Sequence, residues 1–408
     1  MLQGLPRILQ THFPRFHILA LRIWRSSIIR YRFHRRRSSL KAMPASSIGT
    51  VEDDRVIIDR VVASYKKRTE QPSGQWKQIY LDRHRDIHEA FMANDNVRIS
   101  DILRDPLSSD LMYGFDSMCK SLRKYGMRSE DRQAPALTLD ALLSLTESIG
   151  ARRVENPENY GPLANKISGD AVLSQLETAL GIQIPMPNFY PSEFGLATRR
   201  GVMSYRVPQA VWQGWRASQL VLGIEKPRVL EIGGGLGRTA LYAGCFGITD
   251  YTIVDIPVSS IAQGYFLGRA LGPNAVRLHG ETSAQDDSMA IKVMSPAHFL
   301  DGNDRYDLVI NVDSLTEMDR KDAVAYWNAI QKRAAIFLSV NHEGNLFTVA
   351  ELADESISIV RRTRNPSWMR RGYVEEVFEF SQEVSFHVGT PFSPSDEASA
   401  RGAGIGGT

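Results

Sequence analysis

Three glycines and one acidic residue form the clearest chemical pattern in the sequence. Gly233, Gly235 and Gly237 follow the short apolar run Val229–Ile232, which predicts a strand buried on both faces. Glycine allows positive φ angles and lets a ligand approach the backbone closely. Asp255 ends a second apolar run about 20 residues later, where a carboxylate can accept hydrogen bonds from both hydroxyls of a ribose. The pattern therefore predicts a nucleoside site.

The residue two places before the first glycine limits which nucleoside derivative fits. Glu231 would repel the pyrophosphate of a dinucleotide, and the dinucleotide spacing Gly-x-Gly-x-x-Gly is not the one found here. A carboxylate at this place favours a ligand that carries an ammonium and a sulfonium group, directly or through water. A glycine-rich turn without any ligand is the competing interpretation, and the strand–turn–helix–strand context disfavours it.

Alternating strands and helices must position these residues. We expect a strand at Tyr251–Val254, and we prefer Ile291–Met294 over Ala275–His279 as the third strand because of its distance to the next one. Further along, we predict strands at Asp307–Val312 and Ala334–Val340, helices at Ile261–Leu271 and Lys321–Arg333, and a final hairpin at Tyr373–Phe380 and Glu383–Val388. This alternation predicts an α/β fold with a mostly parallel sheet and one antiparallel strand near the C-terminus.

The carboxyl ends of the parallel strands predict where a reaction would take place, because open α/β sheets bind ligands there. Asp313 and Glu317 follow the fourth strand, and His342 follows the fifth. His342 is the first candidate for a base that takes a proton from a hydroxyl, since its reference pKa is near neutral, and the two carboxylates are the other candidates.

Other roles for these three residues are open at this point. The carboxylates could hold Mg²⁺. His342 could bond the backbone, Asp313 could contact a cofactor, and Glu317 could be a charge at a helix N-terminus. Because no His/Cys cluster has transition-metal spacing, we predict no metal site.

Composition and charge bound the class of protein. Residues 1–50 hold ten Arg or Lys and no acidic residue, whereas the remainder has 39 basic and 46 acidic residues and a net charge of −7. This acidic body disfavours specific partnership with nucleic acid. Cys119 and Cys245 make neither a disulfide framework nor a zinc site, so we expect a reducing, cytoplasmic location. The sequence has no run of about 18 uncharged apolar residues, so we predict no transmembrane helix.

Shifts in composition divide the 408 residues into five expected parts. The basic segment 1–51 is expected to be a disordered extension, with a transit peptide or weak membrane-surface contact through residues 1–42 left open, and Met43 is an alternative start. A helical domain is expected at 52–182, with a loop at Arg128–Pro135. The other parts are a substrate-lining connector and helix at 183–222, an α/β domain at 223–388 that holds the nucleoside site, and a disordered tail at 389–408.

The connector is rich in proline, glycine and aromatic residues between Gly181 and Tyr205. Such loops often line a ligand site. Its aromatic and basic side chains could face a sugar, or they could pack as a link between domains, and both interpretations stay open. The residues in question are Tyr190, Arg199, Arg200, Tyr205 and Arg206.

Several motifs together resemble one family, the sugar O-methyltransferases of bacteria, which are class I S-adenosylmethionine (SAM) methyltransferases. The resemblance covers roughly residues 55–385. It rests on the segments Gly195–Gly201, Leu230–Gly237, Tyr251–Pro257, Gln263–Leu267, Asn311–Met318, Ser339–Glu343 and Arg371–Glu376.

The resemblance implies SAM as cofactor and the Rossmann-like sheet of class I methyltransferases, preceded here by a helical N-terminal domain. It implies that the motif residues Glu231, Gly233, Gly235, Gly237 and Asp255 hold SAM. We expect the neighbouring residues Gly234, Ile256 and Asp313 to contact it too. No family pattern fixes the base, so the role of His342 follows from the residues alone.

The sequence therefore predicts methyl transfer from SAM to a hydroxyl of a sugar or glycosylated small molecule. A non-sugar hydroxyl and a non-catalytic scaffold that has kept the fold are the alternatives. A further alternative is a protein that associates with a membrane or with nucleic acid through its Arg-rich N-terminus. The acceptor hydroxyl and the oligomeric state are not predicted.

Overall fold

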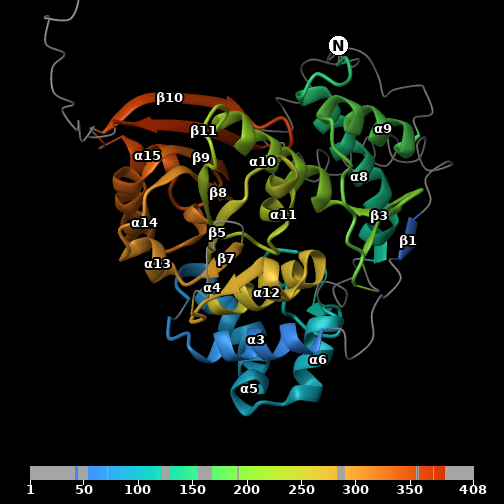
Figure 1. Cartoon of the computed structure of the whole chain (residues 1–408), viewed down its shortest axis with the longest axis vertical. Helices are drawn as coiled ribbons and strands as arrows, with labels where there is room; N and C mark the ends of the chain where they lie inside the picture. The colour runs from blue at the N-terminus through green and yellow to red at the C-terminus, as the bar shows by residue number, and fades with distance from the viewer. Residues whose placement is uncertain are drawn as a thin grey trace, which may run out of the picture.

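An eight-stranded sheet forms the centre of the protein (Figure 1). The computed structural model describes residues 42–44, 54–70, 72–116, 118, 120–121, 128–154, 168–190, 193–282, 290–354, 356, 358–370 and 372–381. The strand order is β10-β11-β9-β8-β4-β5-β7-β6. The strands are β4 (Arg228–Ile232), β5 (Asp250–Val254), β6 (Val276–Leu278), β7 (Ile291–Met294), β8 (Tyr306–Val312), β9 (Ala334–His342), β10 (Ile359–Pro366) and β11 (Tyr373–Phe380).

The pairing confirms the predicted fold class. Strands β6, β7, β5, β4, β8 and β9 are parallel to one another, and β11 runs antiparallel to both β9 and β10. A mostly parallel sheet with one antiparallel strand near its C-terminal end is the sheet of class I SAM-dependent methyltransferases. All of the parallel strands end at the same edge, which brings the turns after β4, β5, β8 and β9 together.

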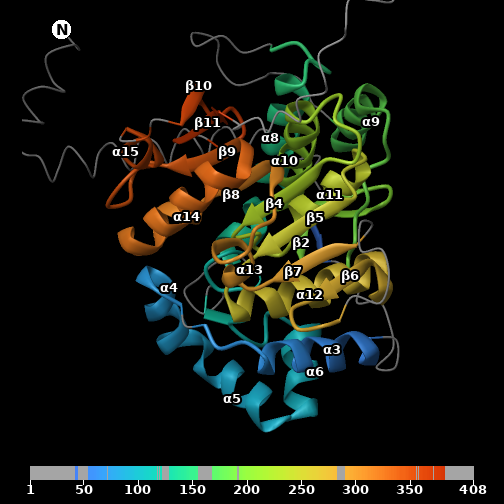
Figure 2. The same ribbon diagram turned by 60° about the vertical axis from the view of Figure 1, so that its left-hand side comes forward.

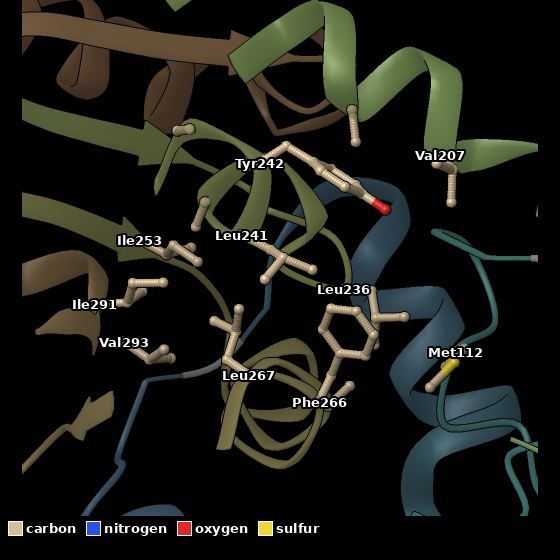
Figure 3. Close-up of a cluster of buried hydrophobic side chains, with 14 of the residues drawn as sticks. Met112, Val207, Leu236, Leu241, Tyr242, Ile253, Phe266, Leu267, Ile291 and Val293 are labelled. Carbon is tan, nitrogen blue, oxygen red and sulfur yellow. The ribbon is translucent and has the colours of Figure 1, made fainter. Parts of the chain in front are cut away.

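Alternate residues of the strands face two different hydrophobic layers, because successive side chains in a strand point to opposite faces. Val229, Ile253 and Leu308 pack with one set of helices: α10 (Arg206–Leu220), α11 (Arg238–Cys245) and α12 (Pro257–Leu271). Leu230 and Val309 pack with the other set: α13 (Pro296–Leu300), α14 (Arg320–Arg333) and α15 (Val349–Ala353). Figure 3 shows part of the first layer, in which Leu236 of the glycine turn points toward Phe266 of α12.

The N-terminal helices do not form one separate body. Helices α3 (Arg55–Lys66), α5 (Arg85–Ala93) and α6 (Asn96–Arg104) lie beneath α12 (Figure 2), preceded in the chain by α4 (Gly74–Ile79) and a π-helical turn at Tyr80–His84. Helices α8 (Arg128–Ser148) and α9 (Gly169–Leu180) lie elsewhere, beside α10 and β2 (Phe194–Thr198). The apolar stripes predicted at 52–182 thus cover two different parts of the α/β unit.

Glycines in α12 let α3 pack unusually close. A Cβ at Gly268 would lie 3.0 Å from Ile57, and one at Gly264 would lie 3.1 Å from Val61. Helix α3 therefore shares its core with α12, which follows the predicted ribose-binding strand.

One local prediction is wrong: residues 128–135, predicted as a loop, lie in α8. The preferred third strand is confirmed as β7, which pairs with β5, and the other candidate is also a strand, β6, which extends the sheet beyond β7. The strand predicted at Tyr373–Phe380 is confirmed as β11, which pairs with β9 and β10. Its predicted hairpin partner at 383–388, like 389–408, lies outside the described residues.

Two expected irregular segments also contain strands. The connector holds a hairpin of β2 and β3 (Gly201–Ser204). Within the expected extension, β1 (Ala42–Pro44) pairs with β2. In the ranges that the structure describes, no helix has the length and apolar character that a membrane span requires.

Candidate functional site

The turn after β4 requires glycine at each of its three predicted positions. The φ angles of Gly233, Gly235 and Gly237 are 73°, 54° and 84°, which lie in the left-handed region. A Cβ at Gly233 would lie 2.2 Å from the Oγ of Ser314. At Gly235 the nearest atom lies 3.9 Å away, so this glycine faces open space. The turn therefore packs against the next loop at one glycine and presents bare backbone at another.

Asp255 ends β5 on the same edge and is tied to the glycine turn through Gln263 of α12. The Gln263 side chain donates to the Oδ2 of Asp255 at 2.6 Å and to the backbone oxygen of Gly235 at 3.0 Å. The backbone N–H of Ile256 donates to the other carboxylate oxygen at 2.8 Å. Burial raises the pKa of Asp255 to about 6. Each oxygen keeps a lone pair for a further donor.

Glu231 lies under the turn and is only 2% exposed. The hydroxyl of Tyr251 donates to its Oε2 at 3.0 Å, and a Cβ at Gly234 would lie 3.1 Å from the same oxygen. Burial raises the pKa of Glu231 to about 7. Because the glycine turn covers Glu231, its charge would act on a ligand electrostatically, across the turn, more than by direct contact.

These residues line one cavity of about 340 Å³. All of the predicted cofactor residues contribute to its wall except Gly237. Gly237 lies at the start of α11 and packs against Leu267 of α12. The predicted residues on the wall are Glu231, Gly233, Gly234, Gly235, Asp255, Ile256, Asp313 and Glu317.

Asp313 has a left-handed backbone, with φ of 61°, directly after β8. Its Oδ2 accepts hydrogen bonds from Arg370 and from the hydroxyl of Tyr373, both at 2.8 Å. Its Oδ1 is buried without a hydrogen-bond partner among the described residues. The Nε2 of His342 lies 3.6 Å from that oxygen.

The hydrogen bond at the other ring nitrogen fixes where neutral His342 holds its proton. The backbone N–H of Gly344 donates to Nδ1 at 3.1 Å, so Nδ1 is the acceptor and Nε2 is protonated. The nitrogen that faces Asp313 is therefore a donor. His342 is not among the residues of the cavity wall, although its ring nitrogen lies close to the carboxylates of both Asp313 and Glu317.

Glu317 lies in a short 3₁₀ turn after β8, on the cavity wall. Trp76 of α4 donates to its Oε2 at 3.1 Å. Burial, and then the charge of Asp313, raise the pKa of Glu317 to about 7. This carboxylate is thus close to half-protonated at neutral pH and reaches the cavity.

The ligand atoms that Asp313, Glu317 and His342 offer lie within 4.8 Å of one another, which is within reach of a single metal ion. Two features of the cluster oppose that use. The nitrogen of His342 that faces the cluster is protonated, and Arg370 already supplies a positive charge to Asp313.

Sequence reasoning missed several side chains on the cavity wall. Trp76 and Phe115 come from the N-terminal segment, their ring centroids 6.4 Å apart, and Arg370 comes from the β10–β11 connection. Helix α10 adds Gln209 and Gln213 beside Arg206, which the sequence had indicated. The spacing of three and four residues on α10 could have indicated one face, but nothing in the sequence shows that this face meets the glycine turn.

Of the five connector residues predicted near a sugar, only Arg206 is on the cavity wall. Tyr190 is 1% exposed and packs in the core. Arg199 and Arg200 lie in the β2–β3 turn and pair with Asp170 and Glu177. Tyr205 lies against the guanidinium of Arg206, with 5.3 Å between the Cζ and the ring centroid.

No family model matches the sequence, and no curated protein does. Among solved structures, the chain is similar to the glycopeptide N-methyltransferase MtfA, with 14% identity, a TM-score of 0.31, and 42% of this chain and 90% of that chain covered. It is similar to the mitomycin 7-O-methyltransferase MmcR, with 13% identity, a TM-score of 0.30, and 43% and 56% covered. It is also similar to the methyltransferase domain of bacterial CtHen1, with 13% identity, a TM-score of 0.30, and 42% and 100% covered. Each match spans less than half of this chain, so the assignment of its fold rests on the strand order and pairing described above.

Proposed function

We propose that the protein is a SAM-dependent O-methyltransferase that acts on a hydroxyl of a sugar or a glycosylated small molecule. One observation carries the proposal: the glycine turn, Asp255 and Glu317, a carboxylate with a raised pKa, line a single cavity at the carboxyl edge of a class I methyltransferase sheet. A dehydrogenase would place a pyrophosphate where Glu231 lies, which the charge disfavours.

The residues present fit SAM as cofactor. Asp255 would accept hydrogen bonds from the ribose, since both of its oxygens keep free lone pairs. The turn would receive the amino-acid part over Gly235, where a Cβ would meet open space. Glu231 beneath the turn favours the positive ammonium and sulfonium groups. Bound SAM supplies an activated methyl group with its leaving group attached, so the protein has to position the acceptor and take its proton.

Glu317 is better placed than His342 to take the proton from the acceptor hydroxyl. It lies on the cavity wall, and its pKa of about 7 suits a base at neutral pH. His342 presents a protonated nitrogen and is not on the cavity wall. We therefore propose Glu317 as the base, with Asp313 positioned by Arg370 and Tyr373 beside it and His342 donating toward Asp313.

The sugar part of the proposal is supported by the other side chains on the cavity wall. Trp76 and Phe115 offer aromatic faces, and Gln209, Arg206 and Arg370 offer polar groups. Aromatic faces combined with hydrogen-bond donors suit the apolar faces and hydroxyl edges of a sugar. A non-sugar acceptor stays the competing outcome of the acceptor screen.

Calorimetric titration of S-adenosylhomocysteine tests the cofactor assignment. We expect the wild type to bind and Asp255→Ala to bind about 10- to 100-fold more weakly, the worth of a hydrogen bond to a charged group. Asp59→Ala is the matched control, because it removes a carboxylate that is 66% exposed on α3. Absence of binding by folded wild-type protein would sink the assignment in favour of a scaffold.

A screen of nucleotide sugars and glycosides for S-adenosylhomocysteine release then tests the acceptor. Turnover only with acceptors that lack a sugar would contradict the sugar part and keep the methyltransferase part.

A further inference from the structure

Among the residues that the structure describes, Arg206 is a cavity arginine without an acidic partner. Arg238 contacts Glu193 at 2.9 Å and Asp116 at 3.4 Å, and Arg370 contacts Asp313 at 2.8 Å. Within the described residues, the hydrogen bond of Arg206 goes to the neutral side chain of Gln209, at 3.2 Å, and no carboxylate lies within ion-pair distance of its guanidinium. A half-buried guanidinium on a cavity wall without a counter-charge is well suited to an anionic ligand group.

The face of α10 that carries Arg206 runs toward the end of the cavity where Glu231 lies. Arg206, Gln209 and Gln213 are three and four residues apart, so they lie on one side of the helix. Gln213 accepts a hydrogen bond from the Thr239 hydroxyl at 2.7 Å, and Thr239 in turn interacts with the Glu231 carboxylate. The seven residues from Arg206 to Gln213 span about 10 Å of helix. The long side chain of Arg206 can bring its guanidinium nearer to the Glu231 end than this backbone distance.

We propose that Arg206 binds the carboxylate at the amino-acid end of the cofactor. The inference rests on the proposed function. In that cofactor the ammonium and the carboxylate share one carbon, so a carboxylate must lie close to an ammonium held over the glycine turn above Glu231. The guanidinium fork of Arg206 matches a carboxylate in two parallel hydrogen bonds. Gln209 holds the fork from the helix side.

An anionic group on the acceptor is the other source of the same chemistry. Arg206 also acts electrostatically on Tyr373, which bonds Asp313. Asp313 and Glu317 face that part of the cavity, however, and two carboxylates repel an acceptor anion. The cofactor carboxylate is instead tied to an ammonium at the Glu231 end of the cavity, toward which the Arg206 face of α10 runs, and it is the source we favour.

Two ligands that differ in the amino-acid part provide the test. S-adenosylhomocysteine carries the carboxylate, and 5′-deoxy-5′-methylthioadenosine keeps the nucleoside and the thioether without it. We expect Arg206→Met to weaken S-adenosylhomocysteine about 10- to 100-fold by calorimetry and to change methylthioadenosine less than about twofold. Arg206→Lys should retain part of the affinity, because it keeps the charge and loses the fork.

Arg199→Met is the matched control, since it removes an arginine that is 88% exposed in the β2–β3 turn. Equal S-adenosylhomocysteine affinity in wild type and Arg206→Met would overturn the inference and leave the proposed function standing. So would an equal loss for both ligands, which would mean that Arg206 only shapes the cavity.

An unchanged affinity for S-adenosylhomocysteine with a raised KM for an anionic acceptor would assign Arg206 to the acceptor and overturn the inference as well. Wild-type protein that binds neither ligand would remove the proposed function itself, and this inference with it. Methylthioadenosine binding by Arg206→Met also shows that the variant is folded.

Discussion

Three carboxylates that face the cavity have raised pKa values, and each is raised first by burial. The pKa of Asp255 is about 6, and those of Glu231 and Glu317 are about 7. A carboxyl whose pKa is higher in the folded than in the unfolded chain lowers stability once the pH exceeds the unfolded value. The site thus holds negative charge at a cost in stability, and a ligand with two positive groups offsets that cost.

The raised pKa of Asp255 predicts how cofactor affinity depends on pH. Ribose hydroxyls donate to the ionised form, so affinity for S-adenosylhomocysteine should increase as the pH rises through about 6. Calorimetry between pH 5 and 8 measures this. In Asp255→Asn the part of the increase centred near pH 6 should be absent. An equally steep increase in the variant would assign it to Glu231 or Glu317 instead.

Glu317→Gln tests the proposed base. The amide cannot take a proton, so kcat should fall about 10²- to 10⁴-fold. In the wild type kcat should rise with pH through about 7, as Glu317 ionises, and the variant should lose this dependence. The measurement is S-adenosylhomocysteine release with an acceptor found in the screen.

Two controls separate the roles within this cluster. His342→Gln should reduce kcat less than Glu317→Gln does, because His342 is not on the cavity wall. A chelator should leave the rate unchanged, since Arg370 already supplies the positive charge beside Asp313. Loss of activity with the chelator and its recovery with Mg²⁺ would replace the base by a metal-bound acceptor.

Among the elements, the turn after β4 holds one glycine that packs against protein, Gly233, and one that faces the cavity, Gly235. Gly233→Ala places a Cβ 2.2 Å from Ser314 at a positive φ, and we expect it to cost about 2–5 kcal/mol of stability. Gly235→Ala bears only the strain of its φ angle, about 1–2 kcal/mol, and its methyl group enters the cavity. Urea unfolding and calorimetry on both variants check this.

The two variants should differ in which property they lose, cofactor affinity or stability. Gly235→Ala should lose cofactor affinity with small loss of stability, and Gly233→Ala should lose mainly stability. If Gly235→Ala bound S-adenosylhomocysteine as tightly as the wild type, the ligand would not approach the backbone there.

Elements with one dominant local signal could be predicted from the sequence. The buried parallel strands β4, β5, β8 and β9 are continuous apolar runs, and they were found nearly to their ends. Strand β10 was missed because it is an edge strand with five exposed residues and the charged sequence Arg361–Arg362. The loop expected at 128–135 is helical although Pro135 stands inside it, so tertiary packing outweighed the local signal.

For the site, the sequence predicted the residues that adjoin strand ends and missed those that arrive from elsewhere. Asp255 and Asp313 follow strands, so parallel pairing alone brings them together. Trp76 reaches Glu317 across 241 positions, and its apolar ring looked like core. The tautomer of His342 depends on one backbone N–H two residues on, which no spacing reveals.

At the scale of the whole molecule, the N-terminal segment completes the cavity. Trp76 bonds Glu317, and Arg68 donates to the backbone oxygen of Asp255 and to Ser260. Residues that precede the sheet in sequence therefore hold both the proposed base and the ribose-binding loop. An α/β unit cut at 223, the boundary expected from composition, would lose these contacts.

A single buried carboxylate, Asp54, fastens this segment to α12 and α6. It is fully buried and accepts hydrogen bonds from Arg104, from Arg269 at 2.9 Å and from the Tyr265 hydroxyl at 2.6 Å. Burial acts to raise the pKa of Asp54, but its hydrogen bonds and the neighbouring arginines outweigh burial and hold it below the usual value of 3.8. Asp54 thus supplies a negative charge to both arginines.

Asp54→Asn should therefore cost about 3–5 kcal/mol in the free energy of unfolding at pH 7, the usual result of breaking a buried ion pair. A lowered pKa gives stability that is fully present above the unfolded pKa and is lost as the pH falls through the folded one. The difference between wild type and variant should stay constant from pH 7 to 5 and shrink below about pH 4. Urea unfolding across this range measures it, with Asp59→Asn as the exposed control on α3. A difference that is small at pH 7 would mean that the N-terminal helices are held to α12 by their apolar contacts alone, since Ile57 and Val61 would then suffice against Gly268 and Gly264.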